Sequence, residues 1–158
     1  MPVQKLKEYL DRHGIKYVTI THSPAYTAQT IAAAAHIPGK DLAKTVMVAL
    51  DENLAMAVLP SSVMVDLERL REAAGVEKAR LATEAEFKGL FPECEVGAMP
   101  PFGNLWDMEV YVDPMLAKDE NIAFNAGSHV ELIKLAYDDF ARLVRPRIIP
   151  LAAMAVGN

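Results

Sequence analysis

The feature that most constrains the fold is a pair of apolar stretches, residues 42–50 and 54–59, separated by Asp51-Glu52-Asn53. Two such stretches joined by a short polar connection are typical of a β-hairpin. Side chains alternate between the two faces of a strand, so Val46 and Met47 should lie on opposite faces. We therefore predict a hairpin over these residues.

The other elements are predicted from helical periodicity, caps and short apolar runs. Asp66 is placed to cap one helix, and Thr83 with Glu86 forms the capping box of another. The predicted helices are 3–13, 28–36, 67–74, 84–91 and 137–144, and the further strands are 17–20, 109–112, 121–125 and 130–135. Helices and strands mix without strict βαβ alternation, repeats or a linker, so we predict one α+β domain over residues 1–158.

The charge of the chain argues against an extended nucleic-acid-binding surface. The net charge is −5 and the pI is about 5.4. Proteins that hold long duplexes draw much of their affinity from a basic stripe, whereas the densest basic group here is Arg142, Arg145 and Arg147. We expect no DNA binding, and contact with a nucleic acid only at an end or over a few nucleotides.

Several other classes of protein are disfavoured. No apolar stretch is long enough to cross a bilayer, and residues 1–5 lead into charged residues without the apolar core of a signal peptide. A single cysteine, Cys94, excludes an internal disulfide framework. The four histidines do not fall at metal-ligand spacing, and the phosphate-binding and dinucleotide-binding motifs are absent. We expect a cytoplasmic protein with no membrane contact, metal or cofactor.

The loop at residues 95–103 is the most informative segment, because Gly97 and Gly103 bracket the stiff Pro100-Pro101 pair. The prolines restrict the backbone, and the glycines permit close backbone approach. Such a loop suits a rigid wall whose N–H groups face a carbonyl or an oxyanion. The alternative interpretation is a stiff connection between a helix and a strand.

Two further segments contain candidate site residues. Lys44 begins an apolar strand, where the alternative is a solvated surface lysine and an inward-facing side chain would need an anion. Residues 125–129 read Asn-Ala-Gly-Ser-His, which is either an ordinary turn or a second backbone wall in which Ser128 and His129 offer polar groups to a ligand.

The ordered set of these segments resembles the YbaK family, which is related to the editing domain inserted in bacterial prolyl-tRNA synthetases. Its parts are Ala-Lys-Thr at 43–45, Gly-x-x-Pro-Pro-Phe-Gly at 97–103, Val-Tyr-Val-Asp at 110–113 and Asn-Ala-Gly at 125–127. His-Ser-Pro-Ala-Tyr-Thr at 22–27 and the alanine-rich helix after it also resemble the opening of that family, and the resemblance covers a core of about residues 5–144. Each motif is weak alone, whereas their order is fairly specific.

The resemblance implies a mixed, strongly curved sheet surrounded by helices, and hydrolysis of the ester that joins a wrong amino acid to the 3′ end of a tRNA. By this resemblance Lys44 anchors the terminal phosphate and ribose, and the loop with Gly97 and Gly103 meets the aminoacyl carbonyl. The expected substrate-binding residues are Thr45, Met47, Pro100, Pro101, Phe102, Asp113, Gly127, Ser128 and His129.

The same resemblance implies assistance by the substrate's own vicinal hydroxyl or side chain, since no Ser-His-Asp or Cys-His pairing is evident. The expected partners are the tRNA acceptor end and an aminoacyl-tRNA synthetase that lends tRNA affinity. Alanine, serine, threonine and cysteine are the candidate amino acids, and the tRNA identity stays open. The rival hypothesis is a non-catalytic module that binds a nucleotide, an amino acid or the acceptor end in the same pocket.

Overall fold

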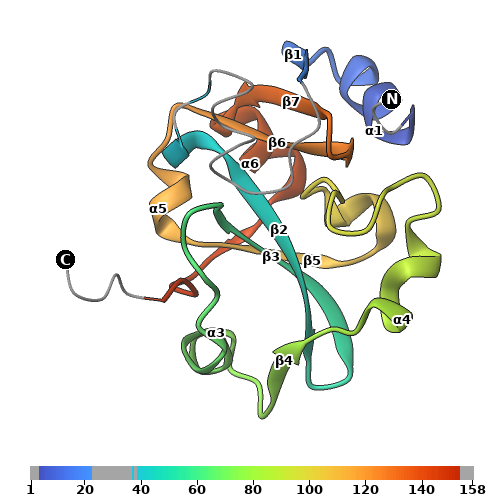
Figure 1. Ribbon diagram of the computed structural model, residues 1–158. Helices are drawn as coiled ribbons and strands as arrows, with labels where there is room; N and C mark the ends of the chain where they lie inside the picture. Colours follow the sequence, from blue (N-terminus) through green and yellow to red (C-terminus); the bar gives the residue numbers. More distant parts are fainter. Residues whose placement is uncertain (1–3, 23–36, 38, 154–158) are drawn as a thin grey trace.

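The computed structural model describes residues 4–22, 37 and 39–153 (Figure 1). Its helices are α1 (Gln4–Arg12), α3 (Leu67–Ala74), α4 (Glu84–Phe87), α5 (Pro114–Ala117) and α6 (Tyr137–Val144), with 3-10 turns η1 (Gly39–Asp41), η2 (Lys88–Leu90) and η3 (Gly103–Trp106). Its strands are β1 (Tyr17–Thr21), β2 (Ala43–Leu50), β3 (Asn53–Pro60), β4 (Ala79–Leu81), β5 (Glu109–Val112), β6 (Asn121–Ser128), β7 (Glu131–Ala136) and β8 (Arg147–Ile148). The helix expected at 28–36 lies outside the described residues. Of the helices that are described, none has the length and apolar character to cross a membrane.

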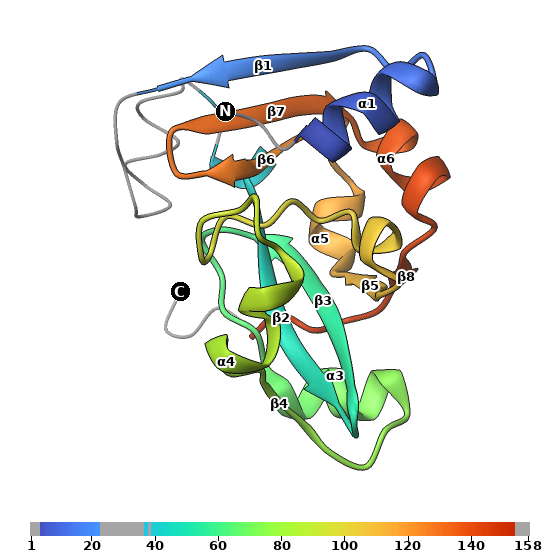
Figure 2. The ribbon, with the colours of Figure 1, turned by 90° about the vertical axis from the view of Figure 1, so that its right-hand side faces the viewer.

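The strands form two sheets. A five-stranded mixed sheet has the order β4-β2-β3-β5-β8, and a three-stranded antiparallel sheet has the order β1-β7-β6. An isolated parallel bridge between Leu42 and Ala123 connects them at the start of β2. Figure 2 shows the three-stranded sheet above the β2–β3 hairpin, with α1 and α6 beside it. The curved sheet implied by the resemblance takes this two-sheet form in an α+β domain.

The predicted hairpin is confirmed, and both of its faces are buried. One face, with Met47 and Met56, packs into the main core. The opposite face, with Val48 and Leu59, packs into a second core that α3 covers through Leu70. Burial on both faces explains why the hairpin sequence is almost continuously apolar, as in strands that have no solvent-facing side.

The main core lies between the two sheets. The hairpin and β5 line it from one side, β6 and β7 line it from the other, and α1 and α6 close its end. Phe102 is fully buried here, with ring centroids 5.5 Å from Phe124 and 5.4 Å from Phe140. The proline loop is therefore anchored through its last aromatic residue in the middle of the core.

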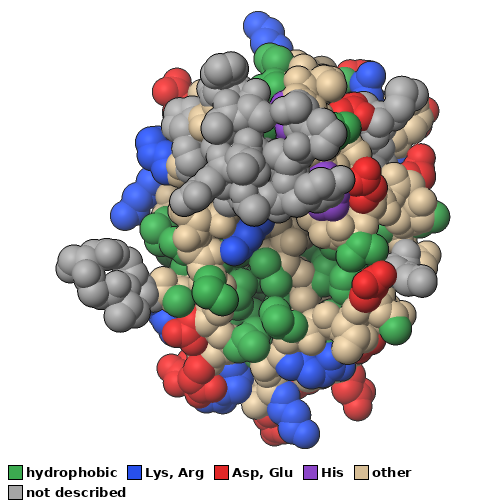
Figure 3. All heavy atoms as spheres, in the orientation of Figure 1, with side chains coloured by type: hydrophobic (Ala, Val, Ile, Leu, Met, Phe, Trp, Pro, Cys, Tyr) green, Lys and Arg blue, Asp and Glu red, His purple; other side chains and the backbone are tan. Residues whose placement is uncertain are grey.

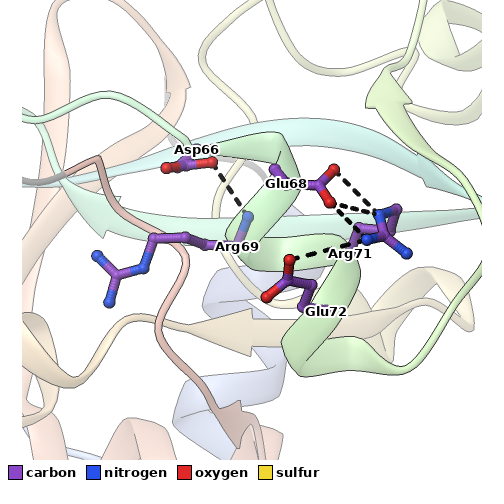
Figure 4. A network of polar contacts seen from close by, with 5 residues as sticks. All are labelled: Asp66, Glu68, Arg69, Arg71 and Glu72. Carbon is purple, nitrogen blue, oxygen red and sulfur yellow. Dashed lines mark hydrogen bonds and ion pairs between the residues drawn. The ribbon is translucent and has the colours of Figure 1, made fainter.

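The cap predicted for α3 is confirmed, because the side chain of Asp66 accepts a hydrogen bond from the backbone N–H of Arg69 at 3.0 Å (Figure 4). Along the exposed face Arg71 pairs with Glu68 and reaches Glu72. Exposed pairs of this kind contribute little to stability. The helix is held mainly by its caps and by the burial of Leu70.

Three short elements, β4, α5 and β8, were not predicted, and α4 ends at Phe87 and continues only as the 3-10 turn η2. These elements depend on tertiary contacts that have no sequence period. The hairpin turn illustrates this, because Asp51 accepts hydrogen bonds from the backbone N–H groups of Glu77 and Lys78 at 3.0 and 2.9 Å. Those contacts align β4 with the edge of β2.

Asp113, at the end of β5, holds the C-terminal segment in place. One of its carboxylate oxygens caps α5 through the backbone N–H of Met115 at 2.9 Å. The other accepts from Leu151 at 3.0 Å and from Ala152 at 2.9 Å. The side chain is buried, so these three donors replace the water that an ionised carboxylate would otherwise require.

Asp113→Asn should destabilise the protein by about 2–4 kcal/mol, because an amide NH2 would face backbone donors in a buried site. Urea unfolding measures the change. Asp107→Asn makes the same substitution at an exposed position and should change the free energy of unfolding by less than about 0.5 kcal/mol. Equal effects of the two substitutions would contradict this role for Asp113.

Candidate functional site

Lys44 is the first residue of the candidate site. It is half-buried on the face of β2 that also carries Leu42 and Val46, and it lies between two apolar clusters to which these neighbours belong. Burial lowers the pKa of its amine. Among the described residues no carboxylate forms an ion pair with it. A half-buried cation without a protein counter-ion favours the binding of an anion at this point.

The structure places the loop at residues 95–103 next to the turn at residues 125–129. The backbone N–H of Glu95 donates to the carbonyl of Gly127 at 2.8 Å, and the N–H of Gly127 donates to the carbonyl of Ala98 at 2.9 Å. Gly97 and Gly127 have φ angles of 86° and 101°, which L side chains rarely adopt. The glycine-proline loop is therefore fixed against the end of β6 by paired backbone hydrogen bonds.

This docking leaves backbone donors on the loop. In the part of the chain that the structure describes, the N–H groups of Gly97 and Met99 donate to no other group. Gly97 is exposed, so its N–H is open to solvent, whereas Met99 is buried, where backbone N–H groups are nearly always paired. Unpaired donors on a rigid loop are suited to an oxygen that carries developing negative charge.

His129 lies directly beyond the Gly127 turn. Its ring Nδ1 is 2.8 Å from a carboxylate oxygen of Glu95, and its backbone N–H donates to the same oxygen at 3.2 Å. The other ring nitrogen, Nε2, lies 3.6 Å from the point that a Cβ on Gly97 would occupy. The hydrogen bond from the His129 side chain, followed by that from its backbone, lowers the pKa of Glu95.

Glu95 has no recognisable role in the sequence, because it lies 34 residues from His129 and belongs to no motif spacing. Asn125 belongs to the Asn-Ala-Gly motif and is not among the predicted site residues. Leu42 forms a parallel bridge with Ala123. Lys44 lies two residues after Leu42 and Asn125 lies two residues after Ala123, so each lies on the same face of its strand as the bridged residue. The amide oxygen of Asn125 is buried without a hydrogen-bond partner in the described part of the chain, which is unusual in a folded protein.

The loop has one end at the site and the other in the core. Pro100 and Pro101 are buried, and Phe102 belongs to the core. A Cβ on Gly103 would lie 2.7 Å from the carbonyl oxygen of Met108 and 2.7 Å from a methyl group of Val110. Gly103 thus permits close packing on β5, whereas Gly97 lies beside His129.

The remaining predicted residues occupy different environments. Thr45 and Met47 lie on the face of β2 opposite Lys44, and Met47 is buried in the main core. Ser128 is buried, and its hydroxyl accepts from the N–H of Val130 at 3.3 Å. Asp113 lies at the same end of the five-stranded sheet as Lys44, with its carboxylate occupied by the C-terminal segment. Their contacts with a substrate stay predictions.

No group of three or more histidine, cysteine, aspartate or glutamate side chains that could hold a metal ion occurs within the described ranges. Cys94 is partly buried, and burial together with the nearby Glu93 raises the pKa of its thiol to about 11. The thiol is therefore protonated at neutral pH, which disfavours it as a nucleophile.

Comparison with known proteins gives a consistent picture. The family model for the aminoacyl-tRNA editing domain matches residues 22–143. A multifunctional Ser/Thr-tRNA deacylase, ProXp-y, from Escherichia coli (strain K12) is 28% identical over 154 residues, which cover 92% of this chain and 90% of the relative. The protein of the same name from Escherichia coli O157:H7 gives the same values.

Two solved structures show the same fold. One, assigned as a trans-editing enzyme for prolyl-tRNA synthetase, superposes with a TM-score of 0.82 at 18% identity and covers 96% of both chains. The other comes from computational grafting of epitopes onto scaffold proteins and has a TM-score of 0.81 at 17% identity, covering 96% of this chain and 97% of that chain.

Cys94→Ser should leave hydrolysis of aminoacyl-tRNA within about twofold of the wild-type rate, because a protonated, partly buried thiol supplies no nucleophile. Steady-state kinetics on the purified variant measure this, with circular dichroism to confirm the fold. A folded Cys94→Ser protein without turnover would instead indicate covalent catalysis.

Proposed function

We propose that this chain, which belongs to the aminoacyl-tRNA editing domain family, hydrolyses in trans the ester of tRNAs mischarged with a small amino acid. The observation that carries the proposal is the position of Lys44. It is a half-buried cation with no counter-ion among the described residues, at the start of a strand that is bridged to β6. The same strand β6 ends in the turn on which the loop with Gly97 is docked.

Lys44 holds the acceptor end of the tRNA in this proposal. An ammonium group is a compact charge suited to one phosphate oxygen, and a phosphate would supply the counter-ion that the site lacks. The net charge of −5 fits contact with the last nucleotides alone, because binding along the acceptor stem would require many more basic contacts.

The chemistry needs little beyond positioning and polarisation, because an aminoacyl ester is already activated. The N–H groups of Gly97 and Met99, which donate to no described backbone group, are the candidate donors to the carbonyl oxygen, whose negative charge increases as water adds. In other enzymes the loss of one such donor costs roughly 3–4 kcal/mol. The substrate's vicinal hydroxyl assists the water, and the free amino acid and the uncharged tRNA leave.

The substrate is a small aminoacyl group. The stiff Pro100-Pro101 pair limits the space beside the carbonyl site, and an apolar pocket rejects larger side chains by steric clash. The same kind of pocket discriminates poorly against an added hydroxyl. Alanine, serine and threonine are therefore the leading candidate substrates, and cysteine is expected to be hydrolysed less readily. The relative named as a Ser/Thr-tRNA deacylase supports this choice.

A synthetase partner would provide the tRNA affinity that this acidic domain lacks. Prolyl-tRNA synthetase is the leading candidate, since a solved structure of the same fold is assigned as a trans-editing enzyme for it. The rival function is a module that binds the acceptor end without turnover. Binding of mischarged tRNA without release of the amino acid would favour that module.

Lys44→Ala should lower kcat/KM about 30- to 150-fold, which corresponds to the roughly 2–3 kcal/mol of a charge-assisted hydrogen bond. Lys44→Met keeps the apolar stem and should show the same loss, whereas Lys44→Arg should recover only part of the activity because its planar fork differs in shape. Release of labelled amino acid from mischarged tRNA measures these rates.

Lys118→Ala is the matched control for Lys44→Ala, since Lys118 is exposed at the end of α5. It should leave both the rate and the thermal midpoint unchanged. A folded Lys44→Ala protein with wild-type activity would remove the basis for the proposed function.

A panel of charged tRNAs tests the substrate class under one set of conditions. Alanyl-, seryl-, threonyl- and cysteinyl-tRNA should be hydrolysed at least about tenfold faster than leucyl- or phenylalanyl-tRNA, because one or two missing methylenes in a tight apolar pocket already change discrimination by that factor. Rapid hydrolysis of the two bulky substrates would contradict a small pocket.

A further inference from the structure

A small cavity lies at the end of the five-stranded sheet that carries Lys44. Its volume is about 380 Å³, its walls are mostly apolar, and its charged lining residues are Arg69 and Asp113. We propose that this cavity binds the nucleotide that precedes the terminal adenosine of a tRNA acceptor end, with Arg69 on the phosphate of that nucleotide. The inference rests on the proposed function for its ligand, and on the lining of the cavity for its geometry.

The cavity and Lys44 lie on the same face of the sheet. Lys44 is paired with Leu59 across the hairpin, and side chains of directly paired residues point to the same side. Leu59 belongs to the apolar cluster that α3 covers. Val63 and Ala152 pack in that cluster and also line the cavity. A ligand held at Lys44 can therefore continue into the cavity without passing around the edge of the sheet.

The distance between Lys44 and the cavity suits neighbouring nucleotides. Lys44 lies on β2, Leu59 on β3, and Asp113 directly after β5, and these three strands are adjacent. The backbone N–H of Asp113 donates to the carbonyl of Val58 at 3.0 Å, so all of these residues lie at one end of the sheet. Neighbouring strands are about 4.8 Å apart, which separates the backbones of Lys44 and Asp113 by about 10 Å. A short run of single-stranded nucleotides can span this distance.

Arg69 presents a cation to the cavity. Its Nη1 donates to the carbonyl of Ala152 at 2.9 Å, whereas the ion pairs of the same helix join Arg71 to Glu68 and Glu72. Figure 4 shows the side chain of Arg69 extending away from those pairs. A guanidinium has five N–H donors in a planar fork that matches a phosphate, so the bond to Ala152 leaves donors for a ligand.

The carboxylate of Asp113 does not take the charge of Arg69. Its two oxygens accept from the backbone N–H groups of Met115, Leu151 and Ala152. Because the carboxylate is directed at those three donors, the guanidinium charge is left for an anion that enters the cavity.

The walls of the cavity suit a nucleobase. Val63, Pro114 and Met115 contribute apolar surface, and the side chain of Met115 is half-exposed. Unstacked bases pack against apolar side chains and against guanidinium planes. A volume of about 380 Å³ lies within the roughly 300–1,000 Å³ of pockets that take small ligands. Walls with so few polar groups add affinity without reading the edge of the base.

Two synthetic esters separate the cavity from Lys44. The seryl ester of adenosine 5′-phosphate carries the terminal phosphate for Lys44 and nothing for the cavity, whereas the seryl ester of the dinucleotide pCpA adds the preceding nucleotide. With the full chain, kcat/KM for the dinucleotide ester should be about 10- to 100-fold higher, because a packed base and a charge-assisted hydrogen bond are added. The gain should appear in KM, with kcat within about twofold, as expected for uniform binding. Equal kcat/KM values for the two esters would overturn the proposal.

Arg69→Met tests the phosphate contact and keeps an apolar stem. It should lower the ratio of the two kcat/KM values at least about fivefold, because the charge-assisted hydrogen bond is lost. Arg71→Met is the matched control two residues later on the exposed face of α3, and it should leave the ratio unchanged. A smaller folded fraction lowers both rates equally, so the ratio does not report unfolding. An unchanged ratio in Arg69→Met would contradict the assignment of Arg69.

The two proposals can fail separately. If the wild type hydrolyses neither ester nor any charged tRNA, the proposed function fails, and binding of uncharged pCpA still decides the role of the cavity. With labelled methionine methyl groups, the nuclear magnetic resonance signal of Met115 should shift with pCpA and stay in place with adenosine 5′-phosphate. A Met115 signal that does not move with pCpA would overturn the cavity assignment, whether or not the protein is active.

Discussion

The burial of both faces of the β2–β3 hairpin is the constraint from which the rest of the fold follows. One face requires the second sheet and the helices α1 and α6, and the other requires α3 and the C-terminal segment. The apolar face that carries Val46 is interrupted once, at Lys44, two residues after the bridge between Leu42 and Ala123. Figure 3 shows hydrophobic side chains gathered on the surface over β2, with charged side chains mostly around and below them. The half-buried ammonium group of Lys44 near the start of this apolar strand is costly for folding, which is a reason to connect Lys44 with function.

Much of the fold could be predicted from the sequence because its larger elements satisfy local rules. The hairpin, α3 with its cap at Asp66, and α6 all have the period or the cap that their residues indicate. The short elements β4, α5 and β8 could not be predicted, because they exist through contacts such as those of Asp51 and Asp113 with distant backbone N–H groups. The two sheets are joined by the isolated bridge between Leu42 and Ala123, which no pattern along the chain indicates.

The candidate site shows the same division between local and distant information. Gly97 and Gly127 are recognisable because their backbone conformations demand glycine, and the structure places their loops in contact. The two glycines of the loop nevertheless serve different purposes, since Gly103 permits packing against Met108. Glu95 could not be identified, because an ordinary exposed glutamate becomes informative only when a histidine far along the chain is seen beside it.

The carboxylate of Asp113 has a consequence for the way the molecule opens. It joins the end of β5, the start of α5 and residues 151–152, so these segments share one set of buried hydrogen bonds. Fluctuations that release the C-terminal segment must also leave one oxygen of the Asp113 carboxylate without its two donors, at the end of the sheet that carries Lys44. Segments coupled in this way open as a single cooperative unit rather than by fraying one at a time. Residues 151–152 thus stabilise the end of the sheet where the acceptor end would bind.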